Sequence, residues 1–408
     1  MYKSLERYTF MHSQYIIIID HMNIFELITQ DKKARRGVLH THHGSVQTPF
    51  FMPIATRGVV KGAIEVSDLR NIGFELLLSN TYHLHLRPGS KYIQEKGGLT
   101  QFMQWNGPIL TDSGGFQVLS LSKHRKISEQ GVTFRSHIDG SIVELTPENV
   151  IDIQYELGID IAMVLDECTP FPCTMEYAQR SMERTTRWAK RCKEHWEKIG
   201  ANKTQHLFAI VQGSEDKDLR EKSAKDLVNL DFPGYAIGGV VESSEKLNEI
   251  IEFTTPFLPN DKLRYVMGVG TPENILNAIE RGIDMFDCVL PTRNARHGQM
   301  FTRHGEINLR NAQWTKSDNP IDEMCHCHTC KNYSVAYLRH LFTINDPLAM
   351  RLGSIHNLHF YHDMMYNARK HIESNSFHEF KEEFIEKRKE KTRTRGTQGL
   401  VKNKHHAT

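Results

Sequence analysis

Residues 282–298 read G-I-D-M-F-D-C-V-L-P-T-R-N-A-R-H-G, a short apolar run with one acid inside it, followed by two arginines. Pro291 ends the run, because proline has no N–H to donate to a strand ladder. A carboxylate in a buried strand, here Asp287, is costly unless it is paired or takes part in chemistry. It either pairs with Arg293 or Arg296, or it lies in a site whose cations suit a polyanionic substrate.

Seven apolar runs of similar length precede this one, and predicted helices separate most of them. The expected strands are residues 50–55, 76–79, 109–111, 161–165, 207–211, 235–237, 264–269 and 285–290. The expected helices are residues 65–72, 88–96, 147–157, 176–198, 216–229, 244–253 and 272–280. Eight strands with intervening helices predict an α/β fold of the (β/α)8 (TIM) barrel type. An open doubly wound sheet is the alternative, but the chain has no dinucleotide-binding fingerprint.

Polar or glycine residues stand at the ends of five expected strands, or next to them. They are Asp112, Asp166, Gln212, Gly239 and Asp287. In a (β/α)8 barrel the carboxyl ends of all strands face one shared pocket, and active sites lie there. This coincidence favours an active site over an isolated ion pair at Asp287.

Length and composition fit a soluble globular protein. A chain of 408 residues suits a barrel of about 250 residues with additions. No apolar run approaches the roughly 20 residues that a membrane-spanning helix needs. The formal net charge is +2, so any nucleic-acid binding must depend on a local patch. Seven cysteines, an odd number, argue against a disulfide framework and for a reducing compartment, so we expect a cytoplasmic protein.

Three cysteines form a C-x-C-x-x-C arrangement: Cys325, Cys327 and Cys330. Three thiolates and one histidine make a closed tetrahedral set, which is typical of a structural zinc site. His326 and His328 are awkward fourth ligands, since they lie between cysteines already bent around the ion. His356 is the preferred fourth ligand. One structural Zn²⁺ per chain is therefore expected.

Four segments together resemble those of bacterial tRNA-guanine transglycosylases. They are residues 112–117 (D-S-G-G-F-Q), 165–168 (L-D-E-C), 286–296 (F-D-C-V-L-P-T-R-N-A-R) and the cysteine trio. The resemblance extends over residues 23–372, and Cys168 matches the bacterial form rather than the eukaryotic one. It implies a pentosyltransferase that exchanges guanine at the wobble position of tRNAs with GUN anticodons for 7-aminomethyl-7-deazaguanine, in queuosine biosynthesis. It also implies a homodimer.

The resemblance implies roles for individual residues. Asp287 is the expected nucleophile, because a carboxylate can trap the oxocarbenium character that develops when a ribose–base bond breaks. Asp112 is the expected general acid/base, although in isolation it also reads as a turn aspartate. The expected base contacts are Phe116, Asp166, Gln212, Gly239 and Met267. Arg293 and Arg296 are expected to contact the tRNA anticodon loop. The zinc is not needed for the chemistry.

One departure from the family concerns residues 240–244, which read V-V-E-S-S, about one residue shorter than usual and without the usual glycine. This loop is expected to border the substituent of the incoming base, so queuine is an alternative to the aminomethyl base. A non-catalytic tRNA-binding subunit is a further alternative. The presence of both Asp112 and Asp287 argues against it. A nucleoside hydrolase would explain neither the cysteines nor the arginines.

The expected organisation has four parts. The barrel covers residues 24–311, with an inserted hairpin at 132–145. A zinc-binding subdomain with a C-terminal helix covers residues 312–373. Residues 1–23 are expected to be a disordered or mis-annotated extension. Residues 374–408 are expected to run from helix into a solvated or disordered basic tail, with a role in holding tRNA as the alternative.

Overall fold

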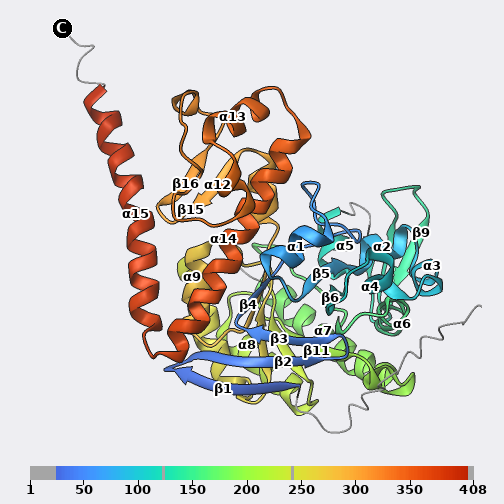
Figure 1. Ribbon diagram of the computed structural model, residues 1–408. Helices are drawn as coiled ribbons and strands as arrows, with labels where there is room; N and C mark the ends of the chain where they lie inside the picture. Colours follow the sequence, from blue (N-terminus) through green and yellow to red (C-terminus); the bar gives the residue numbers. More distant parts are fainter. Residues whose placement is uncertain (1–23, 122–124, 240–242, 403–408) are drawn as a thin grey trace, which may run out of the picture.

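The computed structural model describes residues 24–121, 125–239 and 243–402. The expectation for residues 1–23 lies outside the described residues. At the centre is a parallel sheet curled into a barrel (Figure 1). Its strands are β4 (Phe50–Met52), β5 (Leu77–Asn80), β6 (Ile109–Asp112), β10 (Ile161–Met163), β11 (His206–Val211), β12 (Gly234–Ile237), β13 (Leu263–Val266) and β14 (Met285–Asp287).

The strand order is β4-β14-β13-β12-β11-β10-β6-β5, so the two end strands are β4 and β5. A parallel bridge between Ile54 and Leu78 joins these ends, and the Ala55 N–H donates to the Leu78 carbonyl at 2.6 Å. The sheet is thus nearly closed, and the predicted barrel is confirmed. Its strands are buried on both faces, which is why each appears in the sequence as a continuous apolar run.

The helices around the barrel begin and end close to the predicted residues. They are α1 (Val66–Ile72), α3 (Ser90–Glu95), α6 (Pro147–Leu157), α7 (Met175–Lys198), α8 (Lys217–Asn229), α9 (Ser244–Thr254) and α10 (Pro272–Glu280). Thr146, Thr174, Asp216 and Ser243 cap four of them by accepting a backbone N–H in the first turn. Three short helices were not predicted: α2 (Thr81–Leu86), α4 (Gly98–Met103) and α5 (Gly115–Leu121).

The predicted end of the last strand was wrong. β14 stops at Asp287 rather than at residue 290, and helix α11 (Leu290–Arg296) begins almost at once. Pro291 lies in the first turn of α11, where its fixed φ suits the helix and its missing N–H has no partner to lose. Asp287 is consequently the last strand residue, at the carboxyl end of the barrel.

An antiparallel sheet that was not predicted covers the other end of the barrel (Figure 1). It consists of β1 (Phe25–Asp31), β2 (Ala34–Thr41) and β3 (Gly44–Thr48). Two fully buried acids hold it: Arg35 Nε lies 3.2 Å from Asp284 Oδ1, and the His43 N–H donates to Asp160 Oδ1 at 2.9 Å. Asp160 and Asp284 immediately precede β10 and β14, so this is the amino end of the barrel strands.

The insertion after β6 contains the predicted hairpin. Strands β8 (Val132–Arg135) and β9 (Ile142–Leu145) pair antiparallel, and β7 (Arg125–Ile127) adds a third strand that was not predicted. The insertion therefore lies on the loop side of the barrel, directly after the strand that carries Asp112.

A C-terminal lobe stands beside the barrel (Figure 1). It contains β15 (Gln299–Thr302), β16 (Gly305–Asn308), α12 (His328–Asn332), α13 (Val335–Thr343) and the first part of α14 (Pro347–Glu373). Its own hydrophobic cluster includes Met300, Ile307, Leu338 and Leu352. Helix α14 continues from this cluster down to the barrel, where it contacts β1, β2 and β4.

Helix α15 (Phe377–Lys402) runs back along α14 (Figure 1). The prediction of a solvated or disordered basic run fails at Arg388, which is only 4% exposed. Its Nε is 2.6 Å from Glu273 Oε1, its Nη1 donates to the Thr302 carbonyl at 2.5 Å, and Glu306 pairs with Nη2. The carboxylates of Glu273 on α10 and Glu306 on β16 offset the cost of removing this guanidinium from water.

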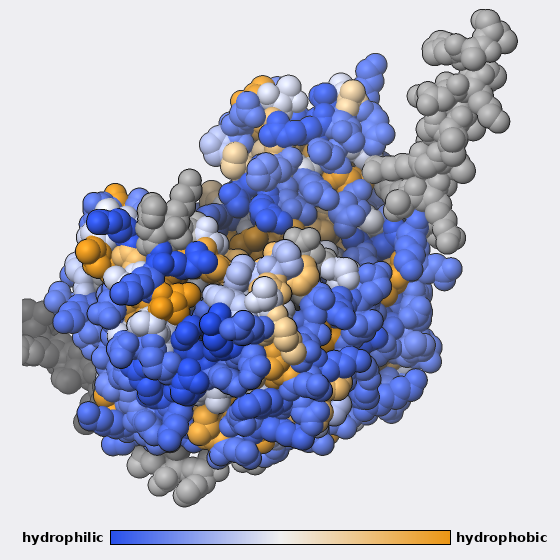
Figure 2. Space-filling model, turned by 180° about the vertical axis from the view of Figure 1, so that it is seen from behind, coloured by the Kyte–Doolittle hydropathy of each residue, from blue (hydrophilic) through white to orange (hydrophobic). Residues whose placement is uncertain are grey.

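The surface seen from behind is mostly hydrophilic, and it is hollowed between the upper lobe and the body (Figure 2). Hydrophobic residues show at the floor of this hollow. Among the described residues, no helix has the length and apolar character needed to cross a membrane.

Candidate active site and metal centre

Asp287 is held through one of its two carboxylate oxygens. The Tyr265 hydroxyl and the Gly268 N–H both donate to Oδ1, the latter at 2.8 Å. No hydrogen bond from the described residues reaches Oδ2. Neither Arg293 nor Arg296 forms an ion pair with Asp287 within the described part of the chain, so the isolated-ion-pair explanation is not supported. The carboxylate is oriented and keeps one oxygen available.

Asp112 ends β6 and lies in a network of polar side chains. Asn80 Nδ2 and Gln117 Nε2 donate to Oδ2 at 2.5 and 2.6 Å, and the Thr81 N–H donates to Oδ1 at 3.1 Å. Asn80 is the residue directly opposite Asp112 in the β5–β6 register. Burial raises the pKa of Asp112 to about 6, while the hydrogen bonds from Asn80 and Gln117 oppose this rise.

The two carboxylates influence each other. The charge of Asp287 contributes to the raised pKa of Asp112. Burial also raises the pKa of Asp287, against the hydrogen bonds from Tyr265 and Gly268. The hydrogen bonds to Asp287 favour its charged form, and the charge of Asp287 favours the protonated form of Asp112. Paired groups of this kind are typical of acid/base sites.

Asp166, Ser113 and Gln212 form a second buried polar group. Ser113 Oγ donates to Asp166 Oδ1 at 3.1 Å, and Gln212 Nε2 donates to Oδ2 at 2.8 Å. Burial raises the pKa of Asp166. Gln212 Oε1 is buried and has no hydrogen-bond partner among the described residues. A buried polar atom without a partner suits a site that a ligand completes.

Glycines bring the backbone close to this group. A Cβ on Gly239 would lie 2.7 Å from Gln212 Oε1, and one on Gly115 would lie 2.9 Å from Asp166 Oδ1. Gly239 also has a φ of +63°, which glycine adopts without strain. Phe116, one of the expected base contacts, is 60% exposed. Met267 is partly buried against the main core.

Arg293 and Arg296 lie on α11, directly after β14. Arg293 is exposed, and Arg296 donates through Nε to the Thr292 carbonyl at 3.2 Å. The guanidinium groups thus stand at the same end of the barrel as Asp287. The expectation for residues 240–244 concerns mostly residues 240–242, which lie outside the described residues.

The predicted metal ligands come together. The ligand atoms of Cys325, Cys327, Cys330 and His356 all lie within 4.8 Å of one another. His356 Nδ1 faces the three sulfurs, and its Nε2 donates to the Phe301 carbonyl at 2.7 Å. This second hydrogen bond fixes the ring and leaves Nδ1 free to bind a metal. His326 and His328, the alternatives to His356, are not part of the cluster.

Sequence reasoning missed the residues that hold the two carboxylates: Asn80, Thr81, Gln117, Tyr265 and Gly268. Gln117 stands in a segment that was quoted for its resemblance, five residues after Asp112, and could have been noted. Tyr265 was visible as the polar aromatic in an expected strand. Asn80 gave no signal, because its role depends on the register of β5 against β6.

Comparison with known proteins agrees with this geometry. The family model described as "Queuine tRNA-ribosyltransferase" matches residues 30–390. A protein of that name from Clostridium tetani is 51% identical over 367 residues, which cover 88% of this chain and 98% of that protein. A protein of the same name from Bacillus velezensis is 52% identical over 367 residues, which cover 89% of this chain and 95% of that protein. Another from Caldanaerobacter subterraneus is 53% identical over 367 residues, which cover 89% of this chain and 97% of that protein. The chain therefore belongs to the queuine tRNA-ribosyltransferase family.

Proposed function

We propose that this protein is a tRNA-guanine transglycosylase, a pentosyltransferase that replaces guanine at the wobble position of tRNAs with GUN anticodons. The replacing base is 7-aminomethyl-7-deazaguanine, and the reaction is a double displacement through a covalent enzyme–tRNA intermediate. One observation carries the proposal. The partly buried carboxylate of Asp112 and the buried carboxylate of Asp287 both lie at the carboxyl end of the barrel in a chain of this family, and the charge of Asp287 raises the pKa of Asp112.

In the first displacement, Asp287 Oδ2 attacks C1′ of the ribose and the bond between C1′ and guanine breaks. Oδ1 keeps its hydrogen bonds from Tyr265 and Gly268. The carboxylate is therefore already oriented for attack by Oδ2 before the reaction begins. Asp112 gives its proton to the departing guanine. The product is an ester between Asp287 and the tRNA, and Asp112 is left ionised.

In the second displacement, the incoming base loses a proton to Asp112 and attacks C1′, which releases Asp287. A pKa of about 6 lets Asp112 act as acid and as base near neutral pH. Guanine must leave before the new base enters the same pocket, so ping-pong kinetics follow from the chemistry.

The base is recognised by the buried group around Asp166. Its carboxylate accepts hydrogen bonds from the ring N–H and exocyclic amine of guanine, donors that 7-deaza analogues share. The side-chain amide of Gln212 and the backbone N–H of Gly239 donate hydrogen bonds to the carbonyl of the base. The exposed ring of Phe116 is free to stack on the base, with Met267 on the other face.

The target nucleotide has to leave the anticodon loop to reach this pocket. Arg293 and Arg296 stand beside Asp287 on α11 and contact neighbouring phosphates or bases. The same family membership supports a homodimer. The grouping of three cysteines for a metal, with every described cysteine free, supports a cytoplasmic location.

The metal is zinc, held by Cys325, Cys327, Cys330 and His356. Three thiols and one imidazole match the closed tetrahedral set of a structural zinc site. The ion organises the lobe beside the barrel and takes no part in base exchange.

Incorporation of radiolabelled guanine into unmodified bulk tRNA tests the proposal. The purified protein is expected to incorporate label, and unlabelled aminomethyl-deazaguanine is expected to chase it out. Queuine, in a parallel chase, separates the aminomethyl preference from the queuine alternative. Binding of tRNA without any incorporation would instead identify a non-catalytic subunit.

A further inference from the structure

The metal centre has a cleft on one side. A cavity of about 210 Å³ lies between α14, α15 and the cysteine loop. Two of the four ligand residues, Cys325 and His356, line it. His356 is fully buried, whereas Cys325 is partly exposed, so Cys325 is the ligand through which the cluster meets the cleft.

A second histidine of α14 faces the same sulfur. His359 Nδ1 lies 3.8 Å from Cys325 Sγ, and His356 Nδ1 lies 3.7 Å from it. The two histidines are three residues apart, so they project from one face of the helix on successive turns. His356 also reaches the sulfurs of Cys327 and Cys330, at 3.6 and 3.3 Å. Within the described part of the chain, His359 makes such a contact with Cys325 alone.

The two rings differ in how firmly they are held. His356 is fixed by its hydrogen bond to the Phe301 carbonyl. No described residue forms a hydrogen bond with the other ring nitrogen of His359, which is partly exposed and lines the cleft. His359 can therefore turn its Nδ1 toward the cluster or toward the cleft.

We propose that His359 is an exchange ligand of the metal centre, and that the cleft is the path by which the ion enters and leaves. The inference rests on the proposed zinc site. During exchange, the bond from the ion to His356 Nδ1 breaks as a bond to His359 Nδ1 forms, while the Cys325 thiolate stays bound. Both imidazoles bind in their neutral form, so the step moves no proton and no electron.

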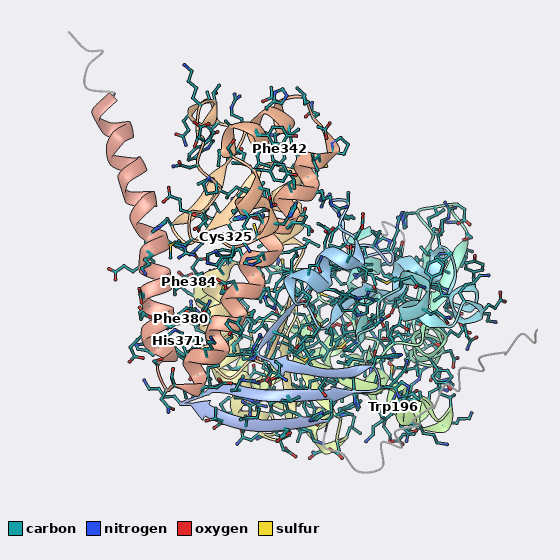
Figure 3. The ribbon with its side chains drawn as sticks, in the orientation of Figure 1. Trp196, Cys325, Phe342, His371, Phe380 and Phe384 are labelled. Atoms are coloured by element: carbon teal, nitrogen blue, oxygen red, sulfur yellow. The ribbon has the colours of Figure 1, made fainter. Side chains whose placement is uncertain are left out.

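The lining of the cleft is consistent with this path. Asp363 lies one further turn along α14 from His359, and His326 stands on the cysteine loop. Carboxylate and imidazole groups are suitable transient ligands for a divalent cation. Phe380 and Phe384 of α15 form the opposite wall, along the seam with α14 in which Cys325 also lies (Figure 3). The carboxylate on the same wall, Glu383, is paired with Lys387, so the polar face of α14 is the route.

Transfer of zinc from the folded, loaded protein to a chromophoric chelator tests the exchange role. His359→Ala is expected to start with the same zinc content as the wild type and to release it about tenfold more slowly, because the ion loses its intermediate ligand. His340→Ala is the control: it removes an exposed histidine of α13 that does not line the cleft and has no described contact with a sulfur, and its release rate should stay that of the wild type. Unchanged or faster release from His359→Ala would overturn the proposal.

A second experiment compares two variants that lack His356, the expected fourth ligand. In His356→Ala, His359 should take that position, so the variant should retain cobalt(II) with the absorption of a tetrahedral site that has a nitrogen ligand. The double variant His356→Ala/His359→Ala should lack that absorption. Identical spectra for the two would refute the role of His359. A wild-type protein that binds no zinc would refute the metal centre as well, whereas a loaded wild type with unaffected variants refutes only the exchange ligand.

Discussion

Asp287 and Asp112 have opposite requirements at the same end of the barrel. In the proposed mechanism, Asp287 must be ionised to attack, and Asp112 must carry a proton when guanine leaves. Burial raises the pKa of both groups, but the ionised Asp287 raises the pKa of Asp112 further. The hydrogen bonds from Tyr265 and Gly268 stabilise the charge on Asp287. The hydrogen-bond and charge partners of each carboxylate thus favour a charged Asp287 and a protonated Asp112.

Asp287→Asn should abolish the covalent adduct with tRNA, because the amide keeps the shape of the side chain but is a poor nucleophile. Binding of tRNA should change by less than about threefold, under 1 kcal/mol. Denaturing gel electrophoresis of enzyme mixed with tRNA measures the adduct. Asp261→Asn, at an exposed turn, is the control and should retain it. An adduct band of normal intensity from Asp287→Asn would assign the nucleophile to another residue.

The raised pKa of Asp112 also predicts a pH-dependent stability. Because its folded-state pKa of about 6 exceeds the ordinary value of 3.8, the native protein binds more protons than the unfolded chain between these values. The contribution of Asp112 to the free energy of unfolding should therefore fall as pH rises from 4 to 6, by about 2–3 kcal/mol. Asp112→Asn should remove this dependence. Urea melts of both proteins across that range measure it, and parallel pH profiles would contradict the assignment.

At the scale of elements, the barrel strands could be predicted from the sequence because both of their faces are buried. The strands of the barrel are continuous apolar runs, and the helices around it begin at side chains that cap them. The β1–β3 sheet was missed because β1 is exposed along most of its length and β2 contains Arg35 and Arg36, so neither strand forms a continuous apolar run. β14 was predicted too long because Pro291 fits both the end of a strand and the start of a helix.

The candidate site could likewise be predicted only in part. Asp112, Asp166, Gln212, Gly239 and Asp287 could be named because strand ends converge in a barrel. Their partners could not, since these depend on which residues of neighbouring strands lie opposite one another. The pairing of Asn80 with Asp112 across β5 and β6 is one example. The metal ligands were predictable because three of them are close in sequence.

The proposed zinc site belongs to the scale of elements, because its residues come from the cysteine loop and from α14. Cys327→Ala should lose the zinc and loosen α12 and α13, since metal-binding energy here is folding energy. Elemental analysis measures the zinc, and hydrogen exchange measures the loosening, which should not extend to the barrel strands. Cys173→Ala, a cysteine outside the cluster, should keep both. Full zinc content in Cys327→Ala would contradict the ligand set.

At the scale of the molecule, α14 and α15 join the barrel to the lobe. Arg388 is a polar connection between them, because it contacts α10 of the barrel and the β15–β16 hairpin of the lobe. Its guanidinium also lies over the rings of Phe301, Phe360 and Phe384. Phe301 supplies the carbonyl that fixes His356. Helix α15 is thus connected to His356 through Arg388 and Phe301.

Arg388→Met should lower the free energy of unfolding by about 2–3 kcal/mol, somewhat less than for a fully buried pair because Glu273 and Glu306 are partly exposed. Lys387→Met is the control, since it removes only an exposed ion pair with Glu383 and should cost less than about 0.5 kcal/mol. Guanidinium chloride melts compare them. Equal losses in the two variants would show that Arg388 adds nothing beyond surface charge.

The position of Arg388 near the end of the chain bears on how the protein matures. Its partners Glu273 and Glu306 are synthesised long before it, and domains fold as units during translation. The barrel and the lobe are therefore made while the ribosome still holds α15. Their mutual alignment is completed only when α15 docks, so the barrel and the lobe are joined after both have been synthesised.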